Sequence, residues 1–386
     1  MPKLPSLSGR SEVAPFIAMD VLRAANERQA AGLPVVHMEV GEPGARAPRV
    51  VVEAAAAALG GERIAYTEAL GLKDLRQRIA TFYGEEYDVD IAPERVVVTT
   101  GSTAGFNLAF LAGFDPGDRV AIPSPGYPCY RNILKALDLV AVEIETGPET
   151  RWALTGEMLQ KAHAEAPLKG VLVASPANPS GTVMTPEALA DLTRAARDLG
   201  IWFLSDEIYH RLTYGAPAAT ALAFDDNAVV LNSFSKYYCM TGWRIGWMIV
   251  PERMKRPVER LGQNLYISAP YLSQRAAMAA FSATEELEAI KAGYAANRAY
   301  LLETLPKIGI DDMLPADGAF YIYANVSRFT NDSQEFARRM LAEAGVAVTP
   351  GADFDTTRGH NYIRFSFAGT AEAMREATAR LGDWLK

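Results

Sequence analysis

Short apolar segments, each followed by polar or glycine residues and then by a helical pattern, recur through the middle of the chain. Clear examples are residues 170–174 (GVLVA), 201–204 (IWFL) and 228–231 (AVVL). Apolar runs of this length are typical of fully buried strands. Strands that alternate with helices predict right-handed βαβ crossovers and a mainly parallel sheet. Ligands of such sheets gather at the carboxyl ends of the strands, so the polar residues found there are candidates for a functional site.

Hydrophobic periodicity also predicts the other elements of the chain. Helical spacing of apolar residues predicts helices at residues 16–31, 50–59, 72–83, 102–111, 154–164, 186–198, 270–281, 285–305, 333–344 and 372–385. Short apolar or alternating runs predict further strands at residues 35–40, 96–99, 119–122, 140–144, 246–250, 320–324, 346–348 and 362–365. The part of the chain after residue 285 mixes helices with strands, which indicates an α+β lobe in addition to the α/β region.

Length and charge exclude several classes of protein. With 386 residues, of which 49% are hydrophobic, the chain can bury a large core and is neither disordered nor fibrous. A net charge of −8 argues against a nucleic-acid-binding surface, which needs clustered Lys and Arg. Residues 1–13 lack the apolar core of a signal peptide, and the longest apolar windows are too short to span a membrane. We therefore expect a cytoplasmic protein without nucleic-acid or membrane partners.

The cysteines and histidines give no sign of a metal centre. The two cysteines, Cys129 and Cys239, cannot build a disulfide framework and fit a reducing compartment. The four histidines are scattered and show no ligand spacing. No metal is expected at the functional site.

One lysine has neighbours that suit nucleophilic chemistry. Residues 233–247 read SFSKYYCMTGWRIGW, so that Lys236 follows a predicted strand and stands among hydroxyl, glycine and aromatic residues. A lysine condenses with an aldehyde only as the neutral amine, and its ordinary pKa of about 10.4 makes that form rare at neutral pH. The cation of Arg244 and partial desolvation by the aromatic neighbours would lower this pKa. We therefore interpret Lys236 as a nucleophile.

The same segment also suits a phosphate dianion. Its neutral and charged donors are Ser233, Ser235 and Arg244. A second set of donors follows the predicted strand at 96–99, where a glycine turn opens a helix and exposed N–H groups with the helix dipole favour an anion. The residues of this turn are Gly101, Ser102 and Thr103. Together the amine and the donors could hold both the aldehyde and the phosphate of pyridoxal 5′-phosphate.

Residues 233–247 resemble the lysine motif of the class I/II aminotransferases, which are fold-type I pyridoxal-phosphate-dependent enzymes. Further family motifs follow in the family's order, from the VGEP turn at residues 40–43 to the strand YIRFSFA at residues 362–368, so the resemblance covers essentially the whole chain. It implies an α/β fold: a large domain with a mainly parallel seven-stranded sheet between helices, and a smaller α+β domain built from both chain ends. The expected divisions are an N-terminal arm at 1–14, a small domain at 15–47 and 285–386, and a large domain at 48–284.

The resemblance assigns cofactor roles to residues at the predicted strand ends. Lys236 would hold the cofactor as an aldimine and carry the proton between substrate and cofactor. Asp206 would pair with the pyridine nitrogen and keep it protonated, which makes the ring an electron sink. Tyr209 and Asn178, the latter in the sequence NPSG, would hydrogen-bond the phenolate oxygen, and Tyr127 would stack on the ring. Without the resemblance, Asp206 could be a helix N-cap.

Substrate binding is implied for Gly41, Asn178 and Arg364. Gly41 would leave room for the substrate carboxylate, although an ordinary turn is the alternative. Arg364 stands among apolar residues on a predicted strand, and a buried guanidinium needs an anionic partner. The resemblance implies that this partner is the α-carboxylate of the substrate, and a structural salt bridge to an acidic side chain is the alternative. Glu207, next to Asp206, is interpreted as solvent-facing or structural.

Tyr66 extends the resemblance to quaternary structure. It begins the pattern Y-x(4)-G-x(3)-LR, which Gly71, Leu75 and Arg76 complete. In the family this tyrosine reaches the phosphate of the neighbouring subunit's cofactor, which implies a homodimer with shared active sites. A tyrosine packed between helices is the alternative.

The implied activity is that of an aminotransferase that moves an amino group between an L-amino acid and a 2-oxo acid by a ping-pong mechanism. A C–S β-lyase on the same fold is an alternative that the motifs do not exclude. Ser233 to Lys236 also fits the S-x-x-K pattern of serine hydrolases, but later S-D-N and K-T-G partners are missing. A non-enzymatic regulator would need a DNA-binding module, and the residues before Val35 are too few and insufficiently basic.

The substrate side chain is less well defined by the sequence. In one bacterial branch of aspartate aminotransferases a lysine binds the distal carboxylate, and this chain has Thr103 in that place. This difference argues against a preference for aspartate. Four aromatic residues could line a pocket for apolar or aromatic side chains: Phe16, Tyr127, Phe320 and Phe354.

Overall fold

A seven-stranded sheet forms the centre of the larger part of the molecule in the computed structural model, which describes residues 5–386. Its order is β2-β8-β7-β6-β5-β3-β4, and only β8 runs antiparallel to its neighbours. The strands are β2 (Val96–Thr99), β3 (Arg119–Ser124), β4 (Val140–Glu145), β5 (Gly170–Ala174), β6 (Trp202–Asp206), β7 (Val229–Ser233) and β8 (Gly246–Ile249). The predicted α/β class and mainly parallel seven-stranded sheet are confirmed.

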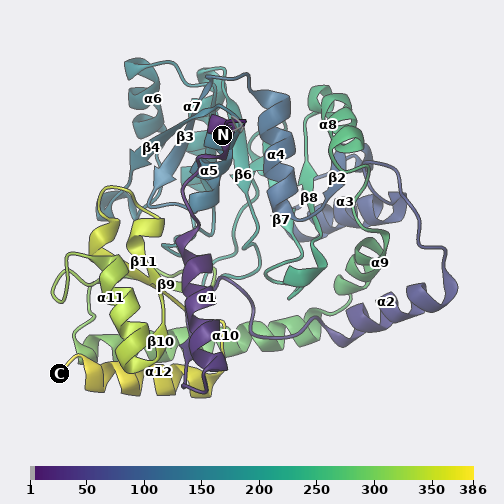
Figure 1. Cartoon of the computed structure of the whole chain (residues 1–386). Helices are drawn as coiled ribbons and strands as arrows, with labels where there is room; N and C mark the ends of the chain where they lie inside the picture. Colours follow the sequence, from purple (N-terminus) through teal and green to yellow (C-terminus); the bar gives the residue numbers. More distant parts are fainter. Residues whose placement is uncertain (1–4) are drawn as a thin grey trace.

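Helices cover both faces of this sheet (Figure 1). Side chains alternate along the buried strands, so in β6 Phe203 faces one layer and Leu204 the other. The layer on the side of Phe203 contains α3 (Lys73–Tyr87), α6 (Gly156–Glu165), α7 (Pro186–Asp198) and α9 (Tyr271–Ala280), with α2 (Arg49–Gly61) against α9. The opposite layer contains α4 (Ser102–Gly113), α5 (Pro128–Ala136) and α8 (Glu252–Leu265).

A smaller lobe combines segments from both ends of the chain. In it, β1 (Val36–His37) pairs in parallel with β10 (Val346–Ala347). A three-stranded antiparallel sheet joins β11 (Thr349–Pro350), β12 (Tyr362–Ser366) and β9 (Tyr321–Asn325). Its helices are α1 (Ile17–Ala30), α11 (Ser333–Arg339) and α12 (Ala371–Trp384). The long α10 (Thr284–Thr304) runs from the region of α2 to this lobe (Figure 1). The domain divisions at residues 14, 47 and 284 stay a prediction.

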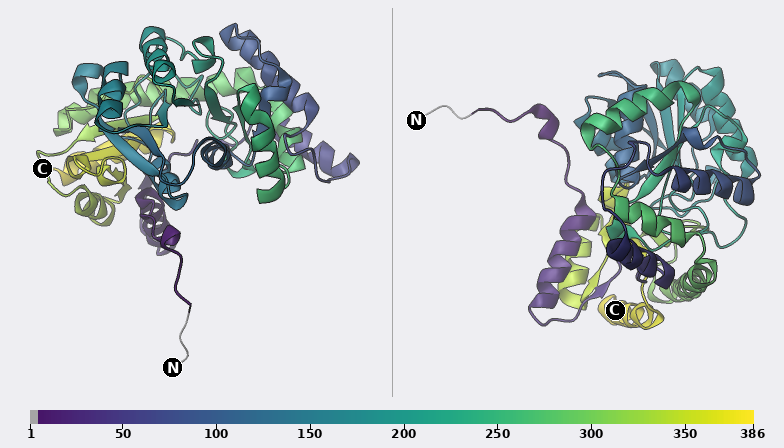
Figure 2. Two further views of the ribbon diagram at one scale, coloured as in Figure 1. Left: turned by 90° about the horizontal axis from the view of Figure 1, so that it is seen from above. Right: turned by 90° about the vertical axis from the view of Figure 1, so that its right-hand side faces the viewer.

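The N-terminal segment leaves the body of the molecule as an extended arm (Figure 2). Residues 1–4 of the predicted arm lie outside the described residues. Where the arm passes α5, the Arg10 guanidinium pairs with Asp138 at 2.5 Å, and Asn132 donates a hydrogen bond to the backbone oxygen of Ala14. Within residues 5–386, no helix combines the length and apolar character needed to cross a bilayer.

Two helices of the structure were not predicted from the sequence. Helix α8 contains Pro257, a residue that normally ends a helix, yet its buried Met254, Val258 and Gly262 keep the i, i+4 spacing of a helical face. Helix α5 is short and begins with Pro128, which is favoured in the first helical turn. Conversely, the strand expected at 35–40 is reduced to two residues. The chain leaves the ladder there because the backbone oxygen of Glu39 bonds side chains of β11 and β12.

Candidate active site

A cavity of about 520 Å³ opens between the carboxyl ends of the large sheet and the smaller lobe. Residues that follow β2, β3, β5, β6 and β7 line it from one side, while Tyr321 and Arg364 line it from the other. The predicted site residues that line this cavity are Gly41, Ser102, Thr103, Tyr127, Asn178, Asp206, Tyr209, Ser235, Lys236, Arg244 and Arg364. The structure therefore brings together most of the candidates, although they are spread over the chain.

Lys236 follows β7, and its Nζ donates a hydrogen bond to the backbone oxygen of Gly41. Burial lowers the pKa of Lys236 to about 8, and the positive charges of Arg364 and Arg244 act in the same direction. The negative charges of Glu42 and Asp206 oppose this shift. The predicted lowering of the pKa is therefore present, but Arg364 contributes more to it than Arg244. At neutral to weakly basic pH the lysine can shed its proton readily.

Asp206 ends β6 and is buried, with one carboxylate oxygen accepting from the backbone N–H of Ile208 at 3.0 Å. Its other oxygen accepts a hydrogen bond from the hydroxyl of Tyr130. Burial raises the pKa of Asp206 to about 6, whereas Tyr130, the Ile208 N–H and Lys236 lower it. Tyr130 was missed in the sequence, although it lies one helical turn after Tyr127 at the start of α5.

Tyr209 forms a buried hydroxyl pair with Tyr321 of β9, with 2.7 Å between the two oxygens. The Nζ of Lys236 lies 6.0 Å from the centre of the Tyr209 ring. A Cβ atom at Gly41 would lie 2.1 Å from the Tyr321 hydroxyl oxygen, so a side chain at position 41 would displace this ring. Glycine at position 41 is thus required by close packing. Tyr321 had no recognisable signal in the sequence.

The donors predicted for a phosphate meet at the N-terminus of α4. Gly101 has φ = 77°, and a Cβ there would lie 2.5 Å from Nη2 of Arg244, so glycine lets the guanidinium approach the helix start. Ser102, Thr103 and Ser235 line the cavity beside it. Ser233 does not line the cavity: its hydroxyl donates to the backbone oxygen of Ile245 and can accept from the hydroxyl of Ser235, 2.8 Å away. Ser233 therefore supports Ser235 from behind.

Arg364 is almost fully buried, and its partners are neutral. Its guanidinium donates to Oδ1 of Asn178 at 2.9 Å, to the backbone oxygen of Glu39 at 2.6 Å and to Oγ1 of Thr349 at 3.1 Å. Its Nε has no partner, and no acidic side chain of residues 5–386 forms a salt bridge with it. The alternative of a structural salt bridge is therefore wrong. A buried cation with an unpaired N–H is prepared for an anionic ligand.

The remaining predictions fall outside this cavity. Tyr66 is 80% exposed in the segment between α2 and α3 and does not line it. Of the four aromatic residues expected around the substrate side chain, Phe16 and Tyr127 line the cavity, whereas Phe320 and Phe354 are buried elsewhere. Phe354 instead packs under the guanidinium of Arg364. Met19 and Leu22 of α1 complete an apolar wall that the sequence did not reveal.

The donor set fits pyridoxal phosphate. A desolvated amine, a buried carboxylate and an anion cradle that a Cβ at position 101 would fill surround one cavity. A serine-hydrolase arrangement is absent, because the hydroxyl of Ser233 bonds Ser235 and Ile245 while the amine of Lys236 bonds Gly41. Within the described part of the chain, no group of three or more His, Cys, Asp or Glu side chains could hold a metal ion.

Comparison with known proteins agrees with this chemistry. Residues 34–381 match the family model "Aminotransferase class I and II". The chain is 51% identical over 380 residues to the valine–pyruvate aminotransferase of Mycobacterium tuberculosis, with 97% of each protein covered. Its fold matches the crystal structure of an aminotransferase from Mycobacterium tuberculosis with a TM-score of 0.96, at 50% identity and 99% coverage of both chains.

A more distant structure gives the same result. The aspartate aminotransferase of Thermus thermophilus, solved with maleate, matches with a TM-score of 0.93 at 32% identity, covering 98% of this chain and 100% of that one. These relatives are transaminases, and nothing among them favours the lyase alternative. The chain therefore belongs to the class I and II aminotransferases, and it is a pyridoxal-phosphate-dependent enzyme that transfers an amino group between an amino acid and a 2-oxo acid.

Proposed function

We propose that Lys236, Asp206 and Arg364 carry the transamination chemistry at this cavity and that the preferred substrates are apolar L-amino acids. The observation that carries the proposal is the convergence of these three residues, from β6, the segment after β7 and β12, on one cavity. When bound, pyridoxal phosphate supplies an aldehyde for the amine and a ring that withdraws electrons from the substrate Cα. The remaining steps depend on the side chains of the chain itself.

Each of the three residues would have a distinct task. The Arg364 guanidinium, together with Asn178, would bind the substrate α-carboxylate and orient the Cα–H bond. The Lys236 amine, with its pKa lowered to about 8, would remove the proton from the substrate Cα and hold it for transfer during the exchange of the amino group. Asp206 would hold a positive charge on the ring nitrogen, and Tyr130 would keep the Asp206 carboxylate ionised for this purpose.

The cavity wall supports the preference for apolar side chains. Phe16, Met19 and Leu22 line it from α1, and Thr103 stands where a second cation would be needed for a distal carboxylate. Among residues 5–386, the cationic residues that line the cavity are Lys236, Arg244 and Arg364. If these three residues are engaged as proposed, none is left to pair with a second substrate carboxylate. The similarity to a valine–pyruvate aminotransferase also supports valine-like donors and pyruvate as acceptor.

A panel of amino donors and 2-oxo acids, followed through the absorbance of the cofactor, tests this proposal. Valine and leucine with pyruvate are expected to turn over efficiently, and aspartate poorly. Lys236→Ala should lose the lysine-bound absorbance and nearly all turnover. Efficient turnover of aspartate would contradict the substrate proposal, and ammonia release from a cysteine conjugate without an oxo acid would identify a lyase instead.

We further propose a cytoplasmic homodimer with shared active sites. Tyr66 is exposed, as are the apolar residues Val52, Leu59, Ile64 and Ile267, and the N–H of Thr67 bonds Ser268, so that the loops carrying Tyr66 and Ile267 adjoin. Exposed apolar side chains on adjoining loops favour contact with another protein surface. The residues Cys129 and Cys239 are both free thiols, as a reducing compartment would leave them.

A further inference from the structure

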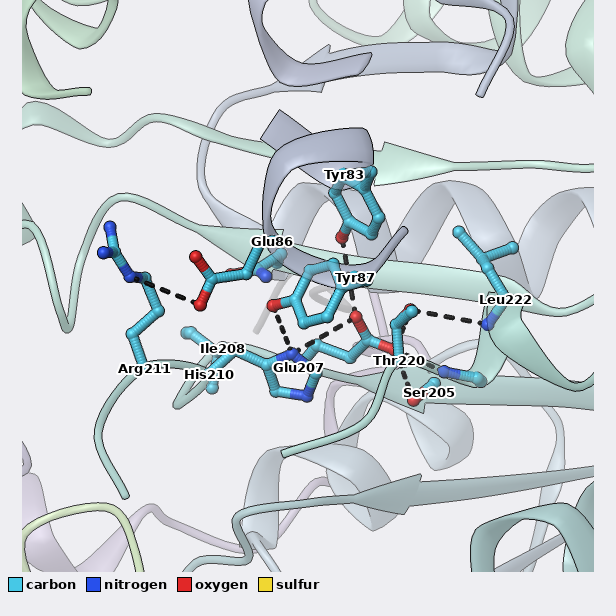
Figure 3. Close-up of polar contacts among 12 residues, drawn as sticks. Tyr83, Glu86, Tyr87, Ser205, Glu207, Ile208, His210, Arg211, Thr220 and Leu222 are labelled. Carbon is cyan, nitrogen blue, oxygen red and sulfur yellow. Dashed lines mark hydrogen bonds and ion pairs between the residues drawn. The ribbon is translucent and has the colours of Figure 1, made fainter. Parts of the chain in front are cut away.

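Glu207 lies next to Asp206 but on the opposite face of the sheet. Consecutive side chains of a strand point to opposite sides, so Asp206 points to the cavity while Ser205 and Glu207 point toward α3. Glu207 is fully buried, which makes its interpretation as solvent-facing wrong. Figure 3 shows its carboxyl group among polar side chains from α3, from the end of β6 with the turn after it, and from the connection to β7. A residue with this environment holds several segments in one arrangement.

One carboxyl oxygen of Glu207 accepts three hydrogen bonds. The donors to Oε1 are the hydroxyl of Ser205 at 3.1 Å, the hydroxyl of Thr220 at 2.9 Å and the backbone N–H of Ala221 at 2.9 Å. Thr220 and Ala221 belong to the connection between β6 and β7. The carboxyl therefore fastens the end of β6 to the loop that leads into β7, the strand before Lys236 (Figure 3).

The other oxygen faces α3. Oε2 of Glu207 lies 3.5 Å from the hydroxyl of Tyr83, which donates to it, and 3.6 Å from Nδ1 of His210. The same nitrogen of His210 lies 2.7 Å from the hydroxyl of Tyr87 (Figure 3). The turn from Glu207 to His210 is thereby anchored to α3 at both of its ends. Asp206 precedes this turn and Tyr209 lies within it.

This arrangement costs folding free energy that an apolar residue would not cost. Burial raises the pKa of Glu207 to about 8 and lowers that of His210 to about 3, so both groups are held in their neutral forms near neutral pH. Both carboxyl oxygens of Glu207 have partners, whereas Nε2 of His210 has none, and a buried carboxyl group bonded in this way favours a single conformation. Packing alone therefore does not explain a carboxyl group at position 207.

We propose that Glu207 is a positioning residue for the active site: its bonds to Ser205, Thr220, Ala221 and Tyr83 fix the direction in which Asp206 and Tyr209 enter the cavity. Because Asp206 and Glu207 are consecutive, a backbone shift at Glu207 that follows the loss of these bonds would also move the Asp206 carboxylate from its place beside Tyr130. The inference rests on the proposed function, in which Asp206 holds the ring nitrogen of the cofactor.

The test compares Glu207→Ala with Glu207→Gln in the cofactor-loaded enzyme. The alanine variant removes all the bonds, whereas glutamine keeps an acceptor for the three donors and a neutral donor toward Tyr83. Since a misplacement of about 1 Å can slow a reaction roughly a hundredfold, we expect the alanine variant to lose between about tenfold and a hundredfold in kcat with little change in KM. The pH at which the lysine-bound cofactor changes absorbance should also shift, and glutamine should restore both values.

Glu86→Gln is the matched control, because Glu86 lies at the edge of the same cluster and pairs with Arg211 at 3.6 Å without contacting Glu207 (Figure 3). Glu86→Gln should leave both kcat and the absorbance titration unchanged.

A folded Glu207→Ala variant with wild-type kcat and absorbance titration would overturn the inference. If the alanine variant does not fold, Thr220→Val, which removes a single donor, decides the question: a smaller shift in the same direction supports the role, and unchanged readouts refute it. Failure of the wild-type enzyme to form the lysine-bound chromophore would instead refute the proposed function.

Discussion

At the scale of single residues, burial shifts the pKa values of the two central groups toward each other. It lowers the pKa of Lys236 to about 8 and raises that of Asp206 to about 6. A lysine that can lose its proton is required for proton transfer, and a carboxylate that keeps its charge is required beside a pyridine nitrogen. Burial serves the first need and opposes the second, so Asp206 depends on its hydrogen-bond donors.

Tyr130→Phe tests this dependence, because it removes the hydroxyl that donates to Asp206 while keeping the ring. The bond lowers the pKa of Asp206, so its loss should raise that pKa. The carboxylate is charged above its pKa, and the acidic limb of the kcat profile should therefore move to higher pH. We expect kcat at neutral pH to fall by about tenfold, which corresponds to roughly 1.4 kcal/mol. An acidic limb that stays in place would show that Tyr130 does not support the charge.

At the scale of elements, the position of α1 decides which side chains face the substrate. Its N-cap residue Phe16 supplies no side-chain hydrogen bond, and the helix is capped instead by the buried Asp353. The carboxylate of Asp353 accepts from the backbone N–H groups of Ile17 and Ala18, at 3.1 Å each. A residue remote in sequence thus places the apolar wall of the cavity.

Asp353→Ala should loosen this helix. Loss of a capping carboxylate costs about 1 kcal/mol, so the thermal unfolding midpoint should fall by a few degrees. Because α1 carries Phe16 and Met19 to the cavity, we expect KM for valine to rise several-fold while KM for a small donor such as alanine changes less. Asp353→Asn, which keeps one acceptor oxygen, serves as the control. Its unfolding midpoint and its KM for valine should lie between those of the wild type and of Asp353→Ala. Equal changes in KM for both donors would show that α1 does not select the side chain.

The sequence predicted elements and site residues to different degrees, for physical reasons. Strands such as β5 and helices such as α7 were placed correctly because a continuous apolar run or a regular spacing reflects burial. The sequence singles out Lys236, Asp206 and Arg364 because the proposed chemistry needs those residue types, and the structure places all three at the cavity. Tyr130, Tyr321 and Asp353 were missed, since their contacts join segments far apart in the chain. For Glu207 the sequence leaves a solvent-facing and a structural role open, because a carboxylate is usually exposed, and its burial agrees with the structural one.

At the scale of the whole molecule, the two lobes meet at the cavity, and each contributes a different part of the site. The larger part supplies Asp206 and Lys236, and the smaller lobe supplies Arg364. Tyr66 lies outside the cavity and is 80% exposed, so within one chain it has no evident task. A symmetric dimer would give it one, because an isologous interface places the same surface of each subunit beside the other.

Mixing two inactive variants tests this arrangement. Lys236→Ala lacks the amine, and Tyr66→Ala lacks the tyrosine proposed to reach the partner's site. In a hybrid dimer one site lacks both residues and the other has both, so equal amounts mixed after reversible dissociation should recover about a quarter of the wild-type activity. The matched control mixes Lys236→Ala with Arg364→Ala. Both residues line the cavity of their own subunit, so each site of this hybrid lacks one of them and no activity above that of the separate variants is expected. Recovery of activity in the first mixture, with none in the control, would support a Tyr66 that reaches the partner's site. If Tyr66 served its own subunit, the hybrid of Tyr66→Ala with Lys236→Ala would instead have two singly defective sites, one lacking Tyr66 and one lacking Lys236, and no activity above that of the separate variants would appear.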